Sequence, residues 1–169
     1  MKHVARFEKV SFQQYKQACE DTCPAGMRLS EEAMREEWES IKLPSRATAG
    51  SAGYDFCVPF NMLFEQGKPR VVPTGIRCAI EPGWALFLFP KSGLGFKYET
   101  HLANTIGVVD SDYYGSDNEG HIMVKMKAGT QFSLQGGQKF VQGIFLPYGV
   151  AEDDHADGVR NGGFGSTGA

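Results

Sequence analysis

The chain has 169 residues, 41% of them hydrophobic, and a formal net charge of −3 at pH 7. This size suits a single domain with a buried core, so residues 1–169 are expected to form one domain. The slightly negative charge provides no basic surface for general nucleic-acid binding. No apolar run approaches the ~20 residues of a membrane span. We therefore expect neither a nucleic-acid partner nor a membrane-bound protein.

The four cysteines carry no metal-site signature. A zinc site would need a second close cysteine pair or a histidine pair, and neither is present beside Cys19, Cys23, Cys57 and Cys78. Reduced thiols, most of them buried, are the better interpretation, and they are typical of a reducing compartment. Residues 1–6 begin a short alternating segment and do not have the pattern of a signal peptide. The sequence thus predicts a cytoplasmic protein.

A helical segment interrupts the N-terminal part of the chain. Residues 4–10 are predicted to form a strand, and residues 11–42 a helical insert of two helices. Ser11 and Ser30 are the expected caps of these helices. Pro24 and Gly26 separate the two, and the second has an apolar stripe that we expect to pack inward: Met34, Trp38 and Ile41.

From residue 43 onward short β-rich runs alternate with turn residues. The predicted strands are 54–58, 71–80, 84–90, 104–109, 122–126 and 139–146. Regular short strands without a βαβ rhythm favour a mainly β sandwich or barrel, such as a jelly roll. Residues 149–161 are polar and lack any period, so residues 149–169 are interpreted as a C-terminal arm that ends in a glycine-rich tail.

The tail has the composition of a phosphate-binding segment. Its glycines allow close backbone approach, and successive N–H groups can form an anion site. Arg160 adds a planar cation that suits phosphate oxygens. Ser166 and Thr167 add hydroxyl donors, and Phe164 offers a face on which a base could stack.

Four further clusters could carry chemistry. The first is residues 49–55, small residues that end in Asp55; the second is residues 90–95, where Lys91, Ser92 and backbone N–H groups could hold a phosphate. The third is residues 104–113, in which Asp110 is a candidate general base. The fourth is residues 137–142, with Gln142 as an amide donor. Each cluster is weak alone, because acids are often only turn formers.

Taken together and in this order, the five clusters resemble the five motifs of the trimeric dUTPase family. The resemblance covers residues 43–169 and implies a jelly-roll-like dUTPase β-barrel. It implies a homotrimer with shared active sites that hydrolyses dUTP to dUMP and pyrophosphate with Mg²⁺. Asp110 would activate the attacking water, and Tyr113 would pack under the deoxyribose and exclude a 2′-hydroxyl.

The resemblance also implies roles for the remaining matched residues. Asn104, Gly107 and Val109 would form the uracil slot. Ser92, Gly93 and Gln142 would hold phosphates, with Lys91 in place of the usual arginine. Asp55 would contact Mg²⁺ through water. The tail would cover the substrate, with Phe164 on uracil and with four residues on the β- and γ-phosphates: Arg160, Gly165, Ser166 and Thr167.

Three departures from the family pattern accompany Lys91. The turn 114–121 is longer than usual, one residue instead of two separates Arg160 from the next glycine pair, and the insert 11–42 replaces a short connection. No matched catalytic position lies in the insert, so we expect it to be dispensable for chemistry. Two alternatives stay open: a dCTP deaminase of the same fold, and a regulatory role, such as viral relatives have, in which the insert binds a protein partner.

Overall fold

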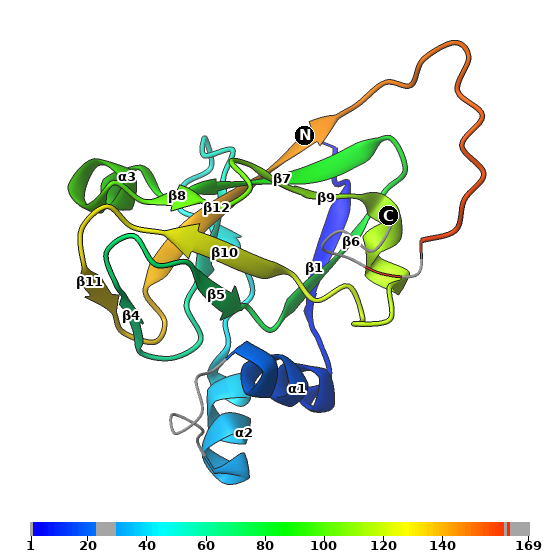
Figure 1. The fold of residues 1–169 in the computed structure, drawn as a ribbon. Helices are drawn as coiled ribbons and strands as arrows, with labels where there is room; N and C mark the ends of the chain where they lie inside the picture. The colour runs from blue at the N-terminus through cyan, green and yellow to red at the C-terminus, as the bar shows by residue number, and fades with distance from the viewer. Residues whose placement is uncertain (1, 23–29, 161, 163–169) are drawn as a thin grey trace.

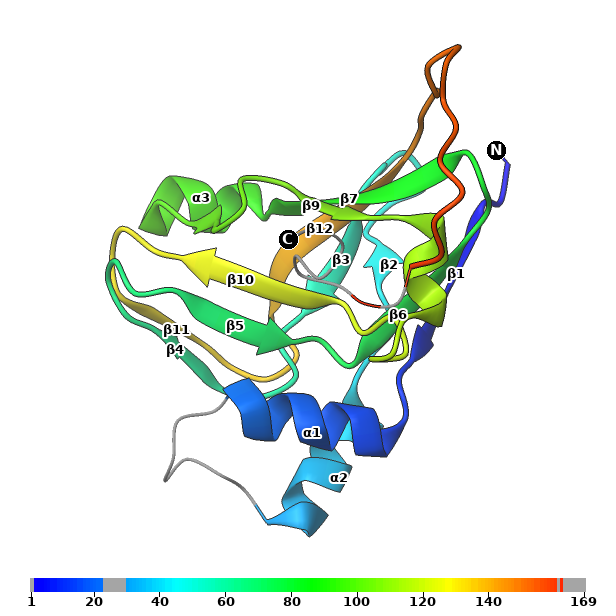
Figure 2. The same ribbon diagram turned by 45° about the vertical axis from the view of Figure 1, so that its right-hand side comes forward.

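Strands make up most of the structure, a computed structural model that describes residues 2–22, 30–160 and 162 (Figures 1 and 2). The strands are β1 (Ala5–Lys9), β2 (Ser45–Arg46), β3 (Tyr54–Cys57), β4 (Met62–Phe64), β5 (Arg70–Pro73), β6 (Ile76–Ile80), β7 (Trp84–Pro90), β8 (His101–Leu102), β9 (Gly107–Val109), β10 (Met123–Lys127), β11 (Phe132–Leu134) and β12 (Lys139–Pro147). The helices are α1 (Phe12–Thr22), α2 (Glu31–Ser40), α3 (Ser92–Tyr98) and the short 3-10 helix η1 (Ser111–Gly115).

The strands pair antiparallel in four sheets within the described residues. The largest has the order β2-β3-β12-β7-β9, and the others are β5-β10-β8, β1-β6 and β4-β11. The mainly β, jelly-roll-like architecture is therefore confirmed. The sheets surround one main core but do not close into a barrel in the described part of the chain.

The main core follows the period of two that β-strands impose. In β6, for example, Ile76, Cys78 and Ile80 are buried, whereas the residues between them are half-buried. Phe56 and Phe140 are among the largest fully buried side chains, and they come from the neighbouring strands β3 and β12. This packing fixes the strand ends on which the predicted site residues lie.

The two predicted helices of the insert are present. Ser30 caps α2 by accepting a hydrogen bond from the Ala33 N–H at 3.2 Å, and Ser11 accepts from the Gln14 N–H at 3.1 Å. The predicted inward stripe is confirmed: Met34 is 7% exposed, and Trp38 and Ile41 pack against the small core of the insert. Figures 1 and 2 show α1 and α2 together at one end of the β-structure.

The predicted strand 71–80 is wrong as a single strand. It divides into β5 and β6, which belong to different sheets. The break lies at Thr74 and Gly75, where Gly75 has φ +71°, a conformation that favours glycine and turns the chain out of the first sheet. The predicted strand 104–109 is shorter than expected, because residues 103–106 form a turn before β9.

None of the helices in residues 2–22 and 30–160 is long and apolar enough to cross a membrane.

Candidate active site

Asp110 and Tyr113 lie where β9 leaves the core. Val109 is only 7% exposed and anchors the end of β9, and η1 begins directly after Asp110. The Asp110 side chain is 43% exposed, so water can reach its carboxylate. Tyr113 is buried, and burial raises the pKa of its phenol, against the opposing hydrogen bond from Asn118 and the charge of Arg160. The pair therefore combines an accessible carboxylate with a fixed, neutral aromatic ring.

Arg160 brings the end of the arm to this pair. Its Nη2 donates to Asp110 Oδ2 at 2.5 Å, and its Nε lies 3.0 Å from Asp112 Oδ1. The guanidinium carbon is 5.8 Å from the centre of the Tyr113 ring, within the range of a cation–π contact. In both ribbon views the arm leaves β12 and returns toward η1 (Figures 1 and 2). The structure thus brings together one cluster of three side chains, those of Asp110, Tyr113 and Arg160.

The turn 103–106 and the strand β9, which precede Asp110, present main-chain groups at a sheet edge. Asn104 is exposed in the turn, and its C=O accepts a hydrogen bond from the Ile106 N–H at 2.7 Å. Gly107 pairs with Leu88 of β7, and no strand lies on the outer side of β9 in the described residues. The side chain of Val109 belongs to the main core, so this residue can offer only its backbone to a base.

A second cluster forms around Asp55 in β3. Its Oδ1 accepts from Lys91 Nζ and its Oδ2 from Lys139 Nζ, both at 2.6 Å. Burial raises the pKa of Asp55, but the hydrogen bonds from Lys139 and Lys91 outweigh it and hold the pKa below its usual value. The same contact raises the pKa of Lys139. The two ammonium groups and the carboxylate together carry one net positive charge.

The remaining predicted phosphate ligands adjoin this cluster. Gln142 is paired with Asp55 across β12 and β3. Ser92 and Gly93 are exposed and form the first turn of α3, whose leading N–H groups have no partner within a helix. Lys91, directly before them, is tied to β12 by a hydrogen bond from its N–H to the Phe140 C=O at 3.1 Å. Hydroxyl, amide and ammonium donors thus gather at one end of the five-stranded sheet.

The two clusters lie at opposite ends of that sheet. Along β7, Leu86 pairs with Val109, next to Asp110, whereas Pro90, next to Lys91, pairs with Val141. Four residues of strand separate these positions, which corresponds to roughly 13 Å at ~3.3 Å per residue. Both ribbon views place α3 and η1 on opposite sides of the fold (Figures 1 and 2). One chain therefore does not bring Asp110 to Ser92 or Gln142.

The side chains form no ready-made magnesium cage. No group of three or more His, Cys, Asp or Glu residues in the described part of the chain could hold a metal ion. Both oxygens of Asp55 are occupied by lysines, and Asp110 is paired with Arg160. Mg²⁺ keeps several waters and commonly binds phosphate oxygens, so the residues present suit a metal that is held mainly by a substrate.

The structure adds partners that the motifs did not reveal. Lys139 binds Asp55, and Asp112 contributes to the position of Arg160. Lys139 stands within the fourth cluster, three residues before Gln142, so its charge was the available signal. Four predicted tail residues lie outside the described part of the chain: Phe164, Gly165, Ser166 and Thr167.

Comparison with known proteins identifies the class to which this site belongs. The sequence model of the dUTPase family matches residues 39–168, which excludes most of the helical insert. The deoxyuridine 5'-triphosphate nucleotidohydrolase of Lactococcus lactis subsp. lactis is 38% identical over 134 residues, covering 76% of this chain and 89% of that protein. The chain therefore belongs to the dUTPase family.

Solved structures agree with this assignment. The crystal structure of dUTPase from Streptococcus mutans is 31% identical, has a TM-score of 0.63, and covers 86% of this chain and 98% of its own. A Staphylococcus bacteriophage 80alpha dUTPase mutant with dUpNHpp has a TM-score of 0.62 and covers 95% of this chain and 100% of its own. At 13% identity, the second comparison supports the fold alone.

Proposed function

We propose that this protein hydrolyses dUTP to dUMP and pyrophosphate. The observation that carries the proposal is the cluster of Asp110, Tyr113 and Arg160, found in a chain of the dUTPase family. An accessible carboxylate, an aromatic ring and a guanidinium group supply a base, a surface for the sugar and a phosphate ligand.

In the proposed reaction Asp110 accepts a proton from a water that attacks the α-phosphorus. The new P–O bond forms as the bond from the α-phosphorus to the bridging oxygen of the β-phosphate breaks, and pyrophosphate leaves. Asp110 is suited to this role because its carboxylate is half-exposed while β9 fixes its backbone. Arg160 would then exchange its contact with Asp110 for the β- and γ-phosphates, together with Gly165, Ser166 and Thr167.

The proposal assigns the other end of the sheet to the triphosphate. Ser92, Gly93, Gln142 and Lys91 supply donors there, and Asp55 holds the two lysines in place. Mg²⁺, when bound to the triphosphate, would withdraw charge from the phosphate oxygens. A water-mediated contact of Asp55 with this ion would use lone pairs of its oxygens that the two lysines leave free.

Base selection is assigned to the turn between β8 and β9 and to the outer edge of β9. This open edge offers main-chain donors and acceptors that would match uracil, beside Asn104, Gly107 and Val109. Cytosine would leave polar groups unpaired there, which costs more than the loss of an apolar contact. Phe164 would cover the base from the tail.

We further propose a homotrimer in which neighbouring chains complete each active site. The separation of Asp110 from Ser92 and Gln142 within one chain supports this assembly, because both groups are needed at the same phosphate. In the trimer, the base of one chain would face the phosphate ligands of another. The arm, exposed over residues 149–159, would be long enough to serve a neighbouring site.

The remaining assignments follow from the same observations. A cytoplasmic location is supported by the thiols of Cys57 and Cys78, which form no disulfide in the described structure. A deaminase would need a glutamate at the base, but Glu119 of the long turn is bound to Ser11 instead. Binding of a protein partner by the insert 11–42 stays a prediction.

Side-by-side turnover of dUTP, dCTP, dTTP and UTP tests the proposal. We expect Mg²⁺-dependent release of pyrophosphate from dUTP above the other nucleotides. Asp110→Asn should keep the fold and bind a non-hydrolysable dUTP analogue, but lose ~3 kcal/mol or more of transition-state stabilisation. Near wild-type kcat in this variant would rule out Asp110 as the base, and release of ammonia from dCTP would identify a deaminase.

A further inference from the structure

The long turn 114–121 is fixed to the body of the protein at several points. Arg77 lies over the Tyr114 ring, with its guanidinium carbon 3.6 Å from the ring centre, and donates to the Tyr114 C=O at 2.8 Å. The Tyr114 hydroxyl donates to Glu8 at 2.7 Å. Glu119 accepts from both the N–H and the hydroxyl of Ser11, at 2.8 and 2.6 Å. These contacts therefore fix the conformation of the turn, and Ser11, the first residue of the insert, supplies two of them.

This turn reaches the Tyr113 hydroxyl through Asn118. The Asn118 Nδ2 donates to the Tyr113 hydroxyl oxygen at 2.8 Å, and that hydroxyl donates to the His121 C=O at 2.8 Å. The Oδ1 of Asn118 accepts from the Gly120 N–H at 3.2 Å. Gly120 has φ +70°, and a Cβ there would come within 2.7 Å of the Tyr113 C=O oxygen.

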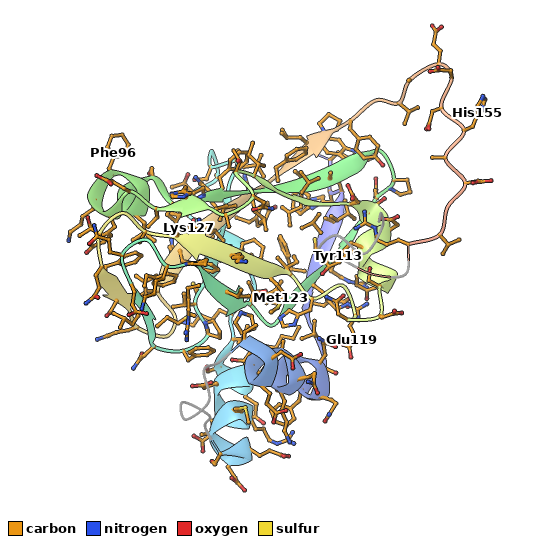
Figure 3. All side chains as sticks on the ribbon, in the orientation of Figure 1. Phe96, Tyr113, Glu119, Met123, Lys127 and His155 are labelled. Carbon is orange, nitrogen blue, oxygen red and sulfur yellow. The ribbon has the colours of Figure 1, made fainter. Side chains whose placement is uncertain are left out.

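These contacts determine the pose of the Tyr113 ring. Its hydroxyl is held from behind by one donor and one acceptor, so the ring cannot swing without breaking hydrogen bonds in a buried place. Figure 3 shows Tyr113 of η1, with Glu119 below it toward the start of α1. The Arg160 guanidinium lies over the ring, on the side that faces the candidate active site.

We propose that Asn118 is a positioning residue that sets the selectivity for deoxyribose over ribose. Through the Tyr113 hydroxyl it holds the ring against the sugar, so that a 2′-hydroxyl would clash with a ring that cannot move away. Without the Asn118 donor the ring can retreat and leave room for the extra oxygen. The inference rests on the proposed function, since it concerns the sugar of the same substrate.

The test is a double-mutant cycle on sugar selectivity. The variants are Asn118→Ala, Tyr113→Phe and the combination of both, and the readout is the ratio of kcat/KM for dUTP to kcat/KM for UTP. Tyr113→Phe keeps the ring and removes only the hydroxyl. Asn118→Ala removes one of the two hydrogen bonds of the hydroxyl and should lower the ratio about five- to tenfold, whereas Tyr113→Phe removes both and should lower it at least as much. The double variant should show no loss beyond that of Tyr113→Phe, because Asn118 acts through that hydroxyl.

A matched control separates this role from simple loss of structure. Asn61→Ala removes an exposed asparagine whose Oδ1, like that of Asn118, accepts from a backbone N–H, that of Gly136 at 2.9 Å, and it should leave the ratio unchanged. Asn118→Leu keeps a side chain of similar length but can neither donate to nor accept from the Tyr113 hydroxyl, so it replaces Asn118→Ala if that variant does not fold. It should lower the ratio in the same direction.

The outcomes distinguish the inference from the function on which it rests. An active wild-type enzyme whose selectivity is unchanged by Asn118→Ala or Asn118→Leu would overturn the inference alone. Additive losses in the double variant would also overturn it, since they would mean that Asn118 acts independently of the hydroxyl. A wild-type protein that does not hydrolyse dUTP would overturn the proposed function and this inference with it.

Discussion

Asp55 is bound by two lysines where the family pattern has one arginine. An arginine at position 91 could bind both carboxylate oxygens with its one planar group. Here Lys91 and Lys139 each bind one oxygen of Asp55 at 2.6 Å. The substitution by lysine therefore does not leave the buried carboxylate half-satisfied, and one positive charge remains beside Ser92 for a phosphate.

His121 is a buried histidine whose geometry requires the neutral form. Its Nε2 accepts a hydrogen bond from the Gly75 N–H at 2.8 Å, and the side chain is fully buried. A protonated imidazole would present a hydrogen at Nε2 and lose this bond. Burial lowers the pKa of His121 from 6.5 to about 4, and the charge of Glu119 opposes this only weakly.

We expect this histidine to make stability depend on pH. Its stabilising contribution should be complete above pH 6.5, the unfolded value, and should decline as the pH falls toward about 4. The difference corresponds to about 3 kcal/mol in the free energy of unfolding. Denaturant unfolding of wild type and His121→Gln between pH 7 and pH 4, at one fixed protein concentration, measures it.

The control for this experiment is an exposed histidine. His155 lies on the arm, and His155→Gln should follow the wild-type pH curve (Figure 3). His121→Gln keeps an acceptor for the Gly75 N–H but does not titrate in this range, so its curve should be flatter. Parallel curves for wild type and His121→Gln would contradict the prediction.

The arm is the segment whose position is least stabilised by contacts within itself. Residues 149–159 are exposed and contain no helix or strand, yet Arg160 is held by Asp110 and Asp112. Because an extended chain has few internal contacts, its position depends on what its end binds. A polyanionic substrate offers Arg160 a stronger set of acceptors than two half-exposed carboxylates.

Truncation after Val159 should therefore impair catalysis without unfolding the protein. Loss of charge-assisted hydrogen bonds from Arg160 and the tail should reduce kcat/KM for dUTP about a hundredfold or more. Steady-state kinetics give this value, and circular dichroism with thermal unfolding checks the fold. Removal of only the last residue, Ala169, is the matched control and should leave the kinetics unchanged. Equal turnover by the enzyme cut after Val159 would refute a role of the tail.

At the scale of the whole molecule, the fold separates groups that one reaction needs together. The strand β7 spans the distance between the end near Asp110 and the end near Lys91. A single chain offers the base at one end and the phosphate donors at the other. Symmetric assembly solves this problem, because rotation about a threefold axis can bring unlike ends of two copies into contact.

Mixed trimers should reveal such shared sites. We expect Asp110→Asn and the double variant Ser92→Ala/Gln142→Ala each to be nearly inactive alone. After joint refolding, random mixing should restore about a quarter of the sites, since the base and the phosphate donors then come from different chains. Light scattering should show a trimer. An active monomer, or no recovery in mixtures shown to be trimeric, would contradict shared sites.

Much of the fold could be predicted because its signals are local. Ser11 and Ser30 carry cap chemistry in their own sequence neighbourhood, and both insert helices are found in the structure. The proximity of Asp110 and Tyr113 could likewise be predicted, because the two residues are only three positions apart in the sequence. In contrast, β4 and β11 have only three residues each, which is too short for a pattern to emerge.

Other features could not be predicted because they depend on distant contacts. Alternation along β12 would place Lys139 and Gln142 on opposite faces, but a bulge pairs them with Cys57 and Asp55, which share a face. The helix α3 contains two glycines and buries no residue. Its sequence therefore has neither a high helix propensity nor an apolar helical period that would predict it. The contact between Arg160 and Asp110 joins residues 50 apart through an arm without any pattern.

The contact between Ser11 and Glu119 joins residues 108 apart in the chain. Ser11 is the first residue of the insert, most of which lies outside the family match, and Glu119 lies in the lengthened turn. Acquisition of the turn alone would leave a carboxylate without its donors, and acquisition of the helices alone would leave their first residue without its acceptor. We therefore expect the two additions to be inherited as a pair, so that descendants of one ancestor keep both or lack both.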